Sequence, residues 1–213
     1  MGTEQAPLLI IDNLVADPEA LVELAATKVF GEVASYYPGV RAKVPLTFQQ
    51  FILTEFGREF APAFGLTGAL RFTACHFSLV TTPPDKLTYL QRIPHVDSLN
   101  SNELASILYL FKKDLGGTSF YRHRKTGFET VDHARQPEYW RHIEAEQAAV
   151  MESASGYIDG ETEFYERIAH QQAVFNRMLV YRRTSLHSGA LNGGSVVETD
   201  PRRGRLSING FLA

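Results

Sequence analysis

Alternation of apolar and polar residues dominates the middle and the end of the chain. After a short β-type run at residues 8–11, strands are predicted over residues 71–81, 87–97, 105–112, 118–124, 173–182 and 205–212. Turn-forming residues separate neighbouring strands, as in Pro83-Pro84-Asp85 and Gly116-Gly117. Several short strands divided by turns favour an antiparallel sandwich or barrel over a wound parallel sheet. The expected fold class is therefore mainly β.

Two amphipathic segments near the N-terminus predict helices that flank the β structure. Asp17-Pro18-Glu19 supplies an N-cap, a proline at the first helical position and an acid in the first turn, so one helix should run to about Phe30. A second helix is predicted from Leu46 to Phe60. Between them, the segment from Tyr36 to Arg41 is aromatic, basic and turn-forming, which suits either a packed turn or a loop that contacts substrate.

Residues 127–172 interrupt the strand pattern with a charged segment that contains the only tryptophan, Trp140. Helical spacing occurs at residues 139–151 and again at 161–170, with Ser153-Ala154-Ser155-Gly156 between them. We expect a helical insert that forms a lid or one wall of a substrate pocket. The length of the chain suits one large core, so residues 1–213 are expected to form a single domain.

Composition mainly excludes some classes of protein. A hydrophobic content of 44%, a charged content of 21% and a net charge of -3 describe an ordinary globular protein and give no reason to expect nucleic acid. No apolar window is long enough to span a membrane. The single cysteine, Cys75, excludes an intrachain disulfide, and residues 1–7 lack a secretory pattern, so we expect a cytoplasmic protein. The sequence leaves the oligomeric state open.

The stretch from Gln91 to Ser98 contains the first candidate for chemistry. In an extended chain His95 and Asp97 point the same way, and together they could hold a metal ion if a third ligand were available. His187 is the best third candidate, because it follows a β-type run and lies among small residues. Two histidines and one carboxylate form the set that holds Fe(II) and leaves coordination positions open.

The remaining histidines have simpler explanations. His133, His142 and His170 belong to the polar insert, where an exposed histidine is expected, and His76 beside Cys75 suits the core or its rim. Other side chains could contact an anionic small-molecule or peptide substrate, although a surface position would also explain each of them. These candidates are Tyr37, Arg41, Arg122, His123 and Arg124.

The last predicted strand places Arg205 and Ser207 on one face. A guanidinium binds a carboxylate through two hydrogen bonds, and a hydroxyl can add another. An arginine inside a small barrel would need an anionic partner, because an unpaired buried charge is costly, and a dicarboxylate co-substrate would supply one. The alternative is an exposed strand arginine, like Arg202 and Arg203.

In their order along the chain, these residues resemble the Fe(II)/2-oxoglutarate-dependent dioxygenases, and most of all their prolyl-hydroxylase branch. The resemblance rests on the succession His95-Val96-Asp97, Tyr109-Leu110, Gly116-Gly117-Thr118-Ser119-Phe120, His187 and Gly204-Arg205-Leu206-Ser207. It covers residues 87–124 and 175–212. Within this superfamily the chain resembles most a bacterial group with no assigned substrate.

The resemblance implies a double-stranded β-helix, or jelly roll, with iron at one mouth. His95, Asp97 and His187 would be the metal ligands, and Arg205 would bind the distal carboxylate of 2-oxoglutarate with help from Ser207 and Tyr109. The co-substrate would be converted to succinate while the substrate is oxidised. Related iron halogenases lack the carboxylate ligand, so Asp97 favours hydroxylation or another oxidation.

Two spacings depart from the family pattern. The interval between His187 and Arg205 is unusually long, with Asn192-Gly193-Gly194 and residues 200–203 inserted, so Arg203 or Arg183 could take the co-substrate role. The insert also lengthens the interval before His187. Two other functions remain open: a cupin-like metalloenzyme that uses the same ligands without 2-oxoglutarate, and a catalytically silent jelly-roll protein that binds a ligand or partner.

Overall fold

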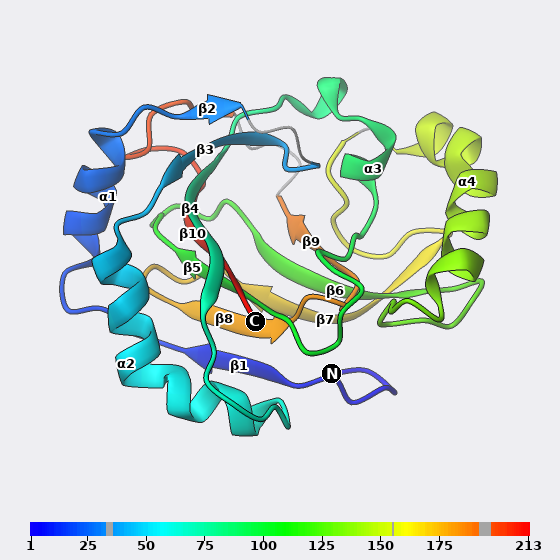
Figure 1. Cartoon of the computed structure of the whole chain (residues 1–213). Coiled ribbons are helices and arrows are strands. Elements are labelled where there is room, and N and C mark those ends of the chain that lie inside the picture. The colour runs from blue at the N-terminus through cyan, green and yellow to red at the C-terminus, as the bar shows by residue number, and fades with distance from the viewer. Residues whose placement is uncertain (33–35, 155, 192–196) are drawn as a thin grey trace.

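The computed structural model describes residues 1–32, 36–154, 156–191 and 197–213. In these ranges two antiparallel sheets form the centre of the molecule (Figure 1). The larger sheet has the order β1 (Leu8–Ile11), β8 (Met178–Arg182), β5 (Leu104–Tyr109), β10 (Leu206–Leu212), β4 (Phe72–Val80), β3 (Gly39–Lys43) and β2 (Gly31–Glu32). The smaller sheet has the order β7 (Tyr165–Gln172), β6 (Gly117–His123) and β9 (His187–Ala190).

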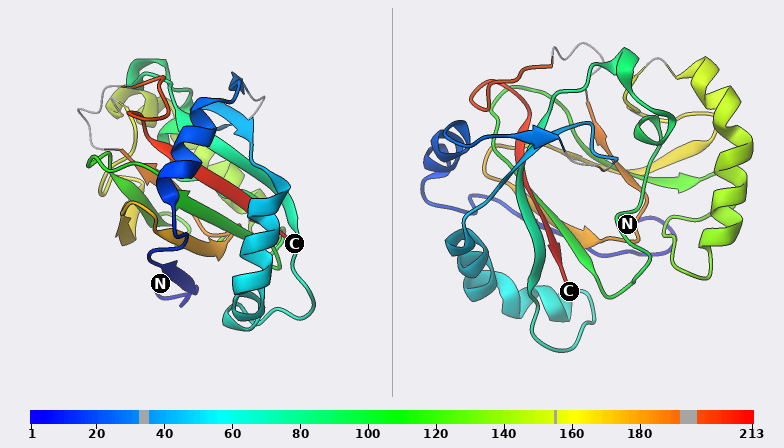
Figure 2. Two further views of the ribbon diagram at one scale, coloured as in Figure 1. Left: turned by 90° about the vertical axis from the view of Figure 1, so that its left-hand side faces the viewer. Right: turned by 45° about the horizontal axis from the view of Figure 1, so that its top comes forward.

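Helices cover the outer surfaces of this β structure. The helices are α1 (Pro18–Ala26), α2 (Leu46–Ala63), α3 (Tyr89–Arg92) and α4 (Gln136–Ser153), with a short 3₁₀ helix, η1 (Pro84–Lys86). Figures 1 and 2 show α1 and α2 on one side of the sheets and α4 on the opposite side. No helix in the described ranges is both long and apolar enough to cross a membrane.

The strands of the larger sheet present apolar side chains to both faces, as a sheet covered on both sides requires. Towards α1 and α2, Phe77, Leu108 and Ile208 pack in one buried cluster with Ile52 and Phe60 of α2. Side chains of the opposite face form a second cluster with the smaller sheet, and this cluster consists of Ala105, Ile107, Tyr109, Phe111, Phe120, Leu179 and Tyr181. Each fully buried large side chain stabilises the fold by about 1.5–3 kcal/mol. The expectation of a mainly β fold with helices at its sides is confirmed.

Helix α4 packs on the outer face of the smaller sheet. Tyr139 and Ile143 of α4 contact Tyr121 of β6 and Tyr165 of β7 in a third buried cluster. The hydroxyls of Tyr139 and Tyr165 share a hydrogen bond of 3.0 Å, so these buried polar groups are satisfied. The helix predicted over residues 139–151 is therefore present and extends a few residues further at each end.

Two predicted elements are wrong. Residues 161–170 were expected to be helical, but β7 pairs with β6 along its whole length, from Tyr165 opposite His123 to Gln172 opposite Gly117. Hydrogen bonding to an otherwise open strand edge outweighs the weak helical preference of this segment. Residues 87–97 were expected to be a strand, but Thr88 and Gln91 form a capping box that begins α3.

Other differences concern boundaries and three strands that were not predicted, β2, β3 and β9. The first helix ends at Ala26 rather than near Phe30, and the aromatic turn after it leads directly into β3. Its partner β4 pairs with β3 from Gly39 opposite Val80 to Lys43 opposite His76. Ser155 and Asn192-Gly193-Gly194, which entered the sequence argument, lie outside the described residues.

Candidate metal centre

His95, Asp97 and His187 come together at one mouth between the two sheets. His95 and Asp97 lie in the loop after α3, and His187 begins β9. One ligand atom from each residue lies within 4.8 Å of the other two. The Nε2 atoms of His95 and His187 lie 3.8 Å and 3.5 Å from the two carboxylate oxygens of Asp97. Two imidazoles and a carboxylate at these separations can share one metal ion.

Backbone hydrogen bonds hold these residues in place. His95 and His187 form an isolated antiparallel bridge, and Asp97 N donates to the carbonyl oxygen of Arg183 over 2.9 Å. The guanidinium of Arg183 in turn donates to the carbonyl oxygen of Asp97 over 2.8 Å and to the Glu103 carboxylate over 2.5 Å. Arg183 therefore fixes the backbone that carries the carboxylate.

The proton on the His187 ring can be assigned from its hydrogen bond. Its Nδ1 lies 2.9 Å from the carbonyl oxygen of Ser185, which can only accept. Nδ1 therefore carries a proton, and Nε2 is the ring nitrogen that lies towards Asp97 and can offer an electron pair to a metal ion. Such a bond from the second ring nitrogen is typical of histidines that bind metals.

His95 is neutral at physiological pH. Burial lowers its pKa to about 4, with further contributions from His187 and Arg41, while Asp97 acts in the opposite direction. His95 lines both of the cavities described below, and 43% of its side chain is accessible. A neutral imidazole is the form that coordinates a metal ion, so the chemistry of the donor set fits a divalent transition metal.

A cavity of about 310 Å³ extends from the three candidate ligands into the space between the sheets. Arg205 lines it and is only 7% exposed. Its Nη2 donates to the carbonyl oxygen of Gly117 over 2.7 Å, and its guanidinium lies 5.5 Å from the centre of the Phe111 ring. Among the described residues its Nε has no hydrogen-bond partner. A buried, incompletely satisfied guanidinium at a cavity wall is suited to bind an anion.

Ser207 and Tyr109 are adjacent to this cavity without lining it. Ser207 donates to Oδ1 of Asn209 over 2.6 Å, and the hydroxyls of Tyr109 and Thr118 share a hydrogen bond of 2.7 Å. Asn209 and Thr118 do line the cavity. Burial raises the pKa of Tyr109, so its phenol stays protonated and can donate. The sequence argument assigned no role to Asn209 or Thr118, although Thr118 lies in a motif that it used.

The two alternative arginines lie elsewhere. Arg183 is engaged by Glu103 and by the backbone of Asp97, as described above, and does not line the cavity. Arg203 has a side chain that is 62% exposed and forms ion pairs with Glu198 and Asp200. Of the three arginines considered, Arg205 is the one that faces the cavity.

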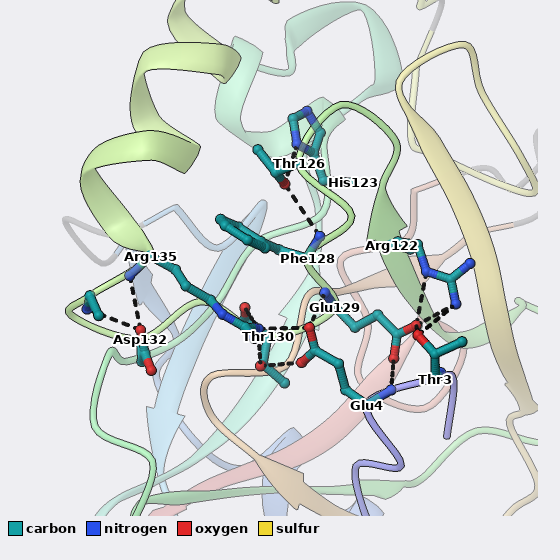
Figure 3. A network of polar contacts seen from close by, with 11 residues as sticks. Thr3, Glu4, Arg122, His123, Thr126, Phe128, Glu129, Thr130, Asp132 and Arg135 are labelled. Carbon is teal, nitrogen blue, oxygen red and sulfur yellow. Dashed lines mark hydrogen bonds and ion pairs between the residues drawn. The ribbon is translucent and has the colours of Figure 1, made fainter.

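The five candidate substrate contacts separate into two groups. Tyr37 and Arg41 line the cavity. Arg122 instead donates to the buried carboxylate of Glu129 over 2.9 Å, within a network that also includes Thr3 (Figure 3). His123 is fully buried with Thr126 and Glu146, and Arg124 pairs with Glu161 on the surface. Arg122, His123 and Arg124 are therefore left out of the site proposed below.

A second cavity, of about 260 Å³, is lined by the same His95-Val96-Asp97 loop. It shares Tyr36, Leu90 and this loop with the first cavity. Helix α4 contributes one of its walls through Gln136, Tyr139, Trp140 and Ile143. The insert thus forms a wall beside the candidate metal centre. A wall or lid formed by this insert was expected from the sequence, where Trp140 and the helical spacing of residues 139–151 had been noted without an assigned place in the wall.

A family model described as "Family of unknown function (DUF6445)" matches residues 1–212. No curated protein matches the sequence.

Several solved structures share the fold. HygX from Streptomyces hygroscopicus, with nickel, 2-oxoglutarate and hygromycin B bound, has a TM-score of 0.57 at 11% identity, over 99% of this chain and 84% of that chain. The non-heme alpha ketoglutarate dependent epimerase SnoN from nogalamycin biosynthesis has a TM-score of 0.53 at 11% identity, over 99% and 78%. An oxidoreductase of the 2OG-Fe(II) oxygenase family from Burkholderia pseudomallei has a TM-score of 0.50 at 11% identity, over 99% and 86%. At such low identity these likenesses show a shared jelly-roll fold.

Proposed function

We propose an oxygenase function for this chain, which belongs to DUF6445, a family of unknown function. The proposed enzyme is a non-haem Fe(II)- and 2-oxoglutarate-dependent oxygenase that hydroxylates a small-molecule or peptide substrate. One observation carries the proposal: a single cavity contains both the His95, Asp97 and His187 cluster and the buried guanidinium of Arg205 with its unbonded Nε.

His95, Asp97 and His187 would hold the iron. When bound, Fe(II) supplies the redox chemistry that couples the breakdown of 2-oxoglutarate to oxidation of the substrate. His187 is bonded through Nδ1, which leaves Nε2 on the side of the metal position, and His95 is neutral, so the His95 ring needs to lose no proton at physiological pH. The bonds from Arg183 and the bridge between the two histidines hold the backbone of the three ligand residues in place before any metal arrives.

Arg205 would bind the distal carboxylate of 2-oxoglutarate. The unbonded Nε gives the guanidinium a free donor, and its burial makes an ion pair with a carboxylate strong. Thr118 and Asn209, held by Tyr109 and Ser207, line the same cavity and can donate further hydrogen bonds. The fold is shared with HygX, whose structure contains nickel and 2-oxoglutarate.

The reaction type rests on Asp97 and on the order of motifs. A carboxylate in the ligand set favours hydroxylation over halogenation, and the succession of motifs from His95 to Ser207 supports a place near the prolyl-hydroxylase branch. One of the solved structures with this fold is an epimerase, so the fold alone does not specify hydroxylation. Hydroxylation is proposed from Asp97 and from the order of the motifs.

An anaerobic titration tests the proposal. Addition of Fe(II) and 2-oxoglutarate to the apo protein should produce a weak visible charge-transfer band. His95→Ala should abolish the band, while Arg203→Gln, at an exposed arginine outside the cavity, should retain it. The proposal fails if the wild-type protein shows no band anaerobically and forms no succinate from 2-oxoglutarate in air.

A further inference from the structure

A second arginine, Arg41, faces the proposed active site from the same sheet that carries Arg205 directly before β10. Arg41 lies on β3 opposite Ser78 of β4, and Ser78 in turn lies opposite Ser207 of β10. Arg41 therefore belongs to the same row of inward-facing residues as the proposed co-substrate site. Its guanidinium lines the cavity and lies 4.4 Å from the centre of the Tyr37 ring.

Arg41 has no anionic partner of its own. Its Nε is buried without a hydrogen-bond partner, and no carboxylate in the described part of the chain forms an ion pair with it. Burial lowers the pKa of Arg41, while Tyr37 and Asp97 raise it. Arg41 and the candidate ligand Asp97 line the same cavity, so the guanidinium lies near the candidate metal ligands. A contact with an aromatic ring stabilises a buried cation less than a charge-assisted hydrogen bond to a carboxylate does.

The charges around the cavity leave one positive charge unmatched. Asp97 is the only acidic residue among the described residues that line it, against two arginines. A divalent metal ion adds two positive charges, and 2-oxoglutarate brings two negative ones. Together with Arg41, Arg205 and Asp97, these groups give the filled site a net charge of one positive unit. In this arrangement 2-oxoglutarate pairs with Arg205 and the metal ion, and Arg41 is left without a counterion. A buried uncompensated charge is unfavourable, so the site favours one further anion.

We propose that Arg41 binds a carboxylate of the organic substrate, whose apolar part lies in the second cavity against α4. This inference rests on the proposed oxygenase function. The second cavity suits an apolar group, because Ile93, Val131 and Ile143 line it together with the ring of Trp140. The two cavities meet at the His95-Val96-Asp97 loop, so a substrate that occupies both would pass directly over the metal site.

The only tryptophan of the chain provides the readout. Trp140 is 36% exposed and lines the second cavity, so its fluorescence should respond when an apolar group enters. The probes are phenylacetate, phenylpropanoate and phenylbutyrate, each compared with its neutral amide of the same shape. They are titrated into the full chain loaded with Ni(II) and 2-oxoglutarate, a combination that binds without turnover.

At least one acid should bind about tenfold to hundredfold more tightly than its amide, as expected for a charge-assisted hydrogen bond. Arg41→Gln should remove this preference and leave the binding of 2-oxoglutarate unchanged, while Arg41→Lys should keep part of it. Arg58→Gln, at an exposed position of α2, is the control and should behave as the wild type.

Three results would overturn the inference: equal binding of acids and amides to the wild type, no fluorescence response to either, or an Arg41→Gln variant that weakens 2-oxoglutarate as much as the acids. The first comparison uses only the unaltered protein and does not depend on how the variants fold. Absence of the anaerobic Fe(II) band in the wild type would instead contradict the oxygenase function. A normal band, with acids bound no more tightly than their amides, would contradict the role of Arg41 alone.

Discussion

The backbones of His95 and His187 hydrogen-bond to each other in both directions. His95 N donates to the carbonyl oxygen of His187 over 2.9 Å, and His187 N donates to that of His95 over 3.0 Å. This bridge joins the loop after α3 to the first residue of β9. Because main-chain atoms make it, the two rings stay 4.4 Å apart, between centroids, without help from a metal ion.

The first prediction is that the candidate ligands can be changed without unfolding the protein. In His95→Ala the backbone bridge remains, and the side chain removed is 43% exposed, so the free energy of unfolding should change by only about 1 kcal/mol or less. Chemical denaturation measures this change, and calorimetric titration with Ni(II) measures metal affinity. Retained affinity in His95→Ala would show that the metal binds elsewhere.

The second prediction concerns Arg183, which touches no proposed ligand atom. Arg183→Met removes the donor to the Asp97 carbonyl oxygen and the ion pair with Glu103. Metal affinity should fall by about tenfold to hundredfold, as is typical when a group that orients a ligand is lost. Arg203→Met is the matched control, since that arginine is 62% exposed and pairs with Glu198. Equal metal affinities in the two variants would exclude a positioning role for Arg183.

The site shows what sequence patterns can and cannot supply. His95, Asp97 and His187 were selected by residue type and spacing, and the structure brings them together. His95 and Asp97 were expected to point the same way because they would lie in a strand. The structure instead has a loop, which hydrogen-bonds through its backbone to Arg183 and His187. Those contacts join segments far apart in the sequence, and local periodicity carries no information about them.

The third prediction tests the contact between Tyr109 and Thr118. Tyr109→Phe leaves the buried Thr118 hydroxyl without its partner and disturbs a wall of the co-substrate cavity. The affinity for 2-oxoglutarate should fall by about fivefold, which corresponds to about 1 kcal/mol for one net hydrogen bond. Thr118→Val should have the same effect, and the double variant should be no worse than either single one. Additive losses would mean that the two hydroxyls act separately.

The fourth prediction is a pH-dependent stability due to Glu129. Burial alone would raise its pKa, but hydrogen bonds from Glu4 N, from Thr3 and from Arg122 outweigh burial and lower it below the ordinary 4.5. A carboxylate with a lowered folded-state pKa stabilises the protein above the unfolded pKa and loses this contribution as the pH falls through the folded-state value. Stability should therefore decline as the pH drops below 4.5.

Glu129→Gln tests this assignment. The variant should be less stable at neutral pH by about 2–4 kcal/mol, because Arg122 loses its buried counterion. It should also show a shallower loss of stability in acid. Glu161→Gln, whose carboxylate is 61% exposed and pairs with Arg124, should follow the wild-type profile. Parallel acid profiles for Glu129→Gln and the wild type would contradict the assignment.

The fold was predictable where one pattern dominated. The last strand, β10, places Ile208 on the α2 side and Ser207 on the opposite side, with Arg205 directly before the strand, and its position was predicted within one residue. Strand β3 was missed because Pro38-Gly39 indicates a turn, and Arg41 therefore received no defined orientation from the sequence. Strand β7 forms because it pairs with the edge of β6. This pairing cannot be read from the sequence of the β7 segment alone.

The most direct test of the central claim is a crystal structure of the protein soaked anaerobically with Fe(II) and 2-oxoglutarate. The account predicts a metal ion bound by His95, Asp97 and His187, with the distal carboxylate of 2-oxoglutarate on the guanidinium of Arg205. A metal ion bound by other residues, or 2-oxoglutarate bound away from Arg205, would contradict it.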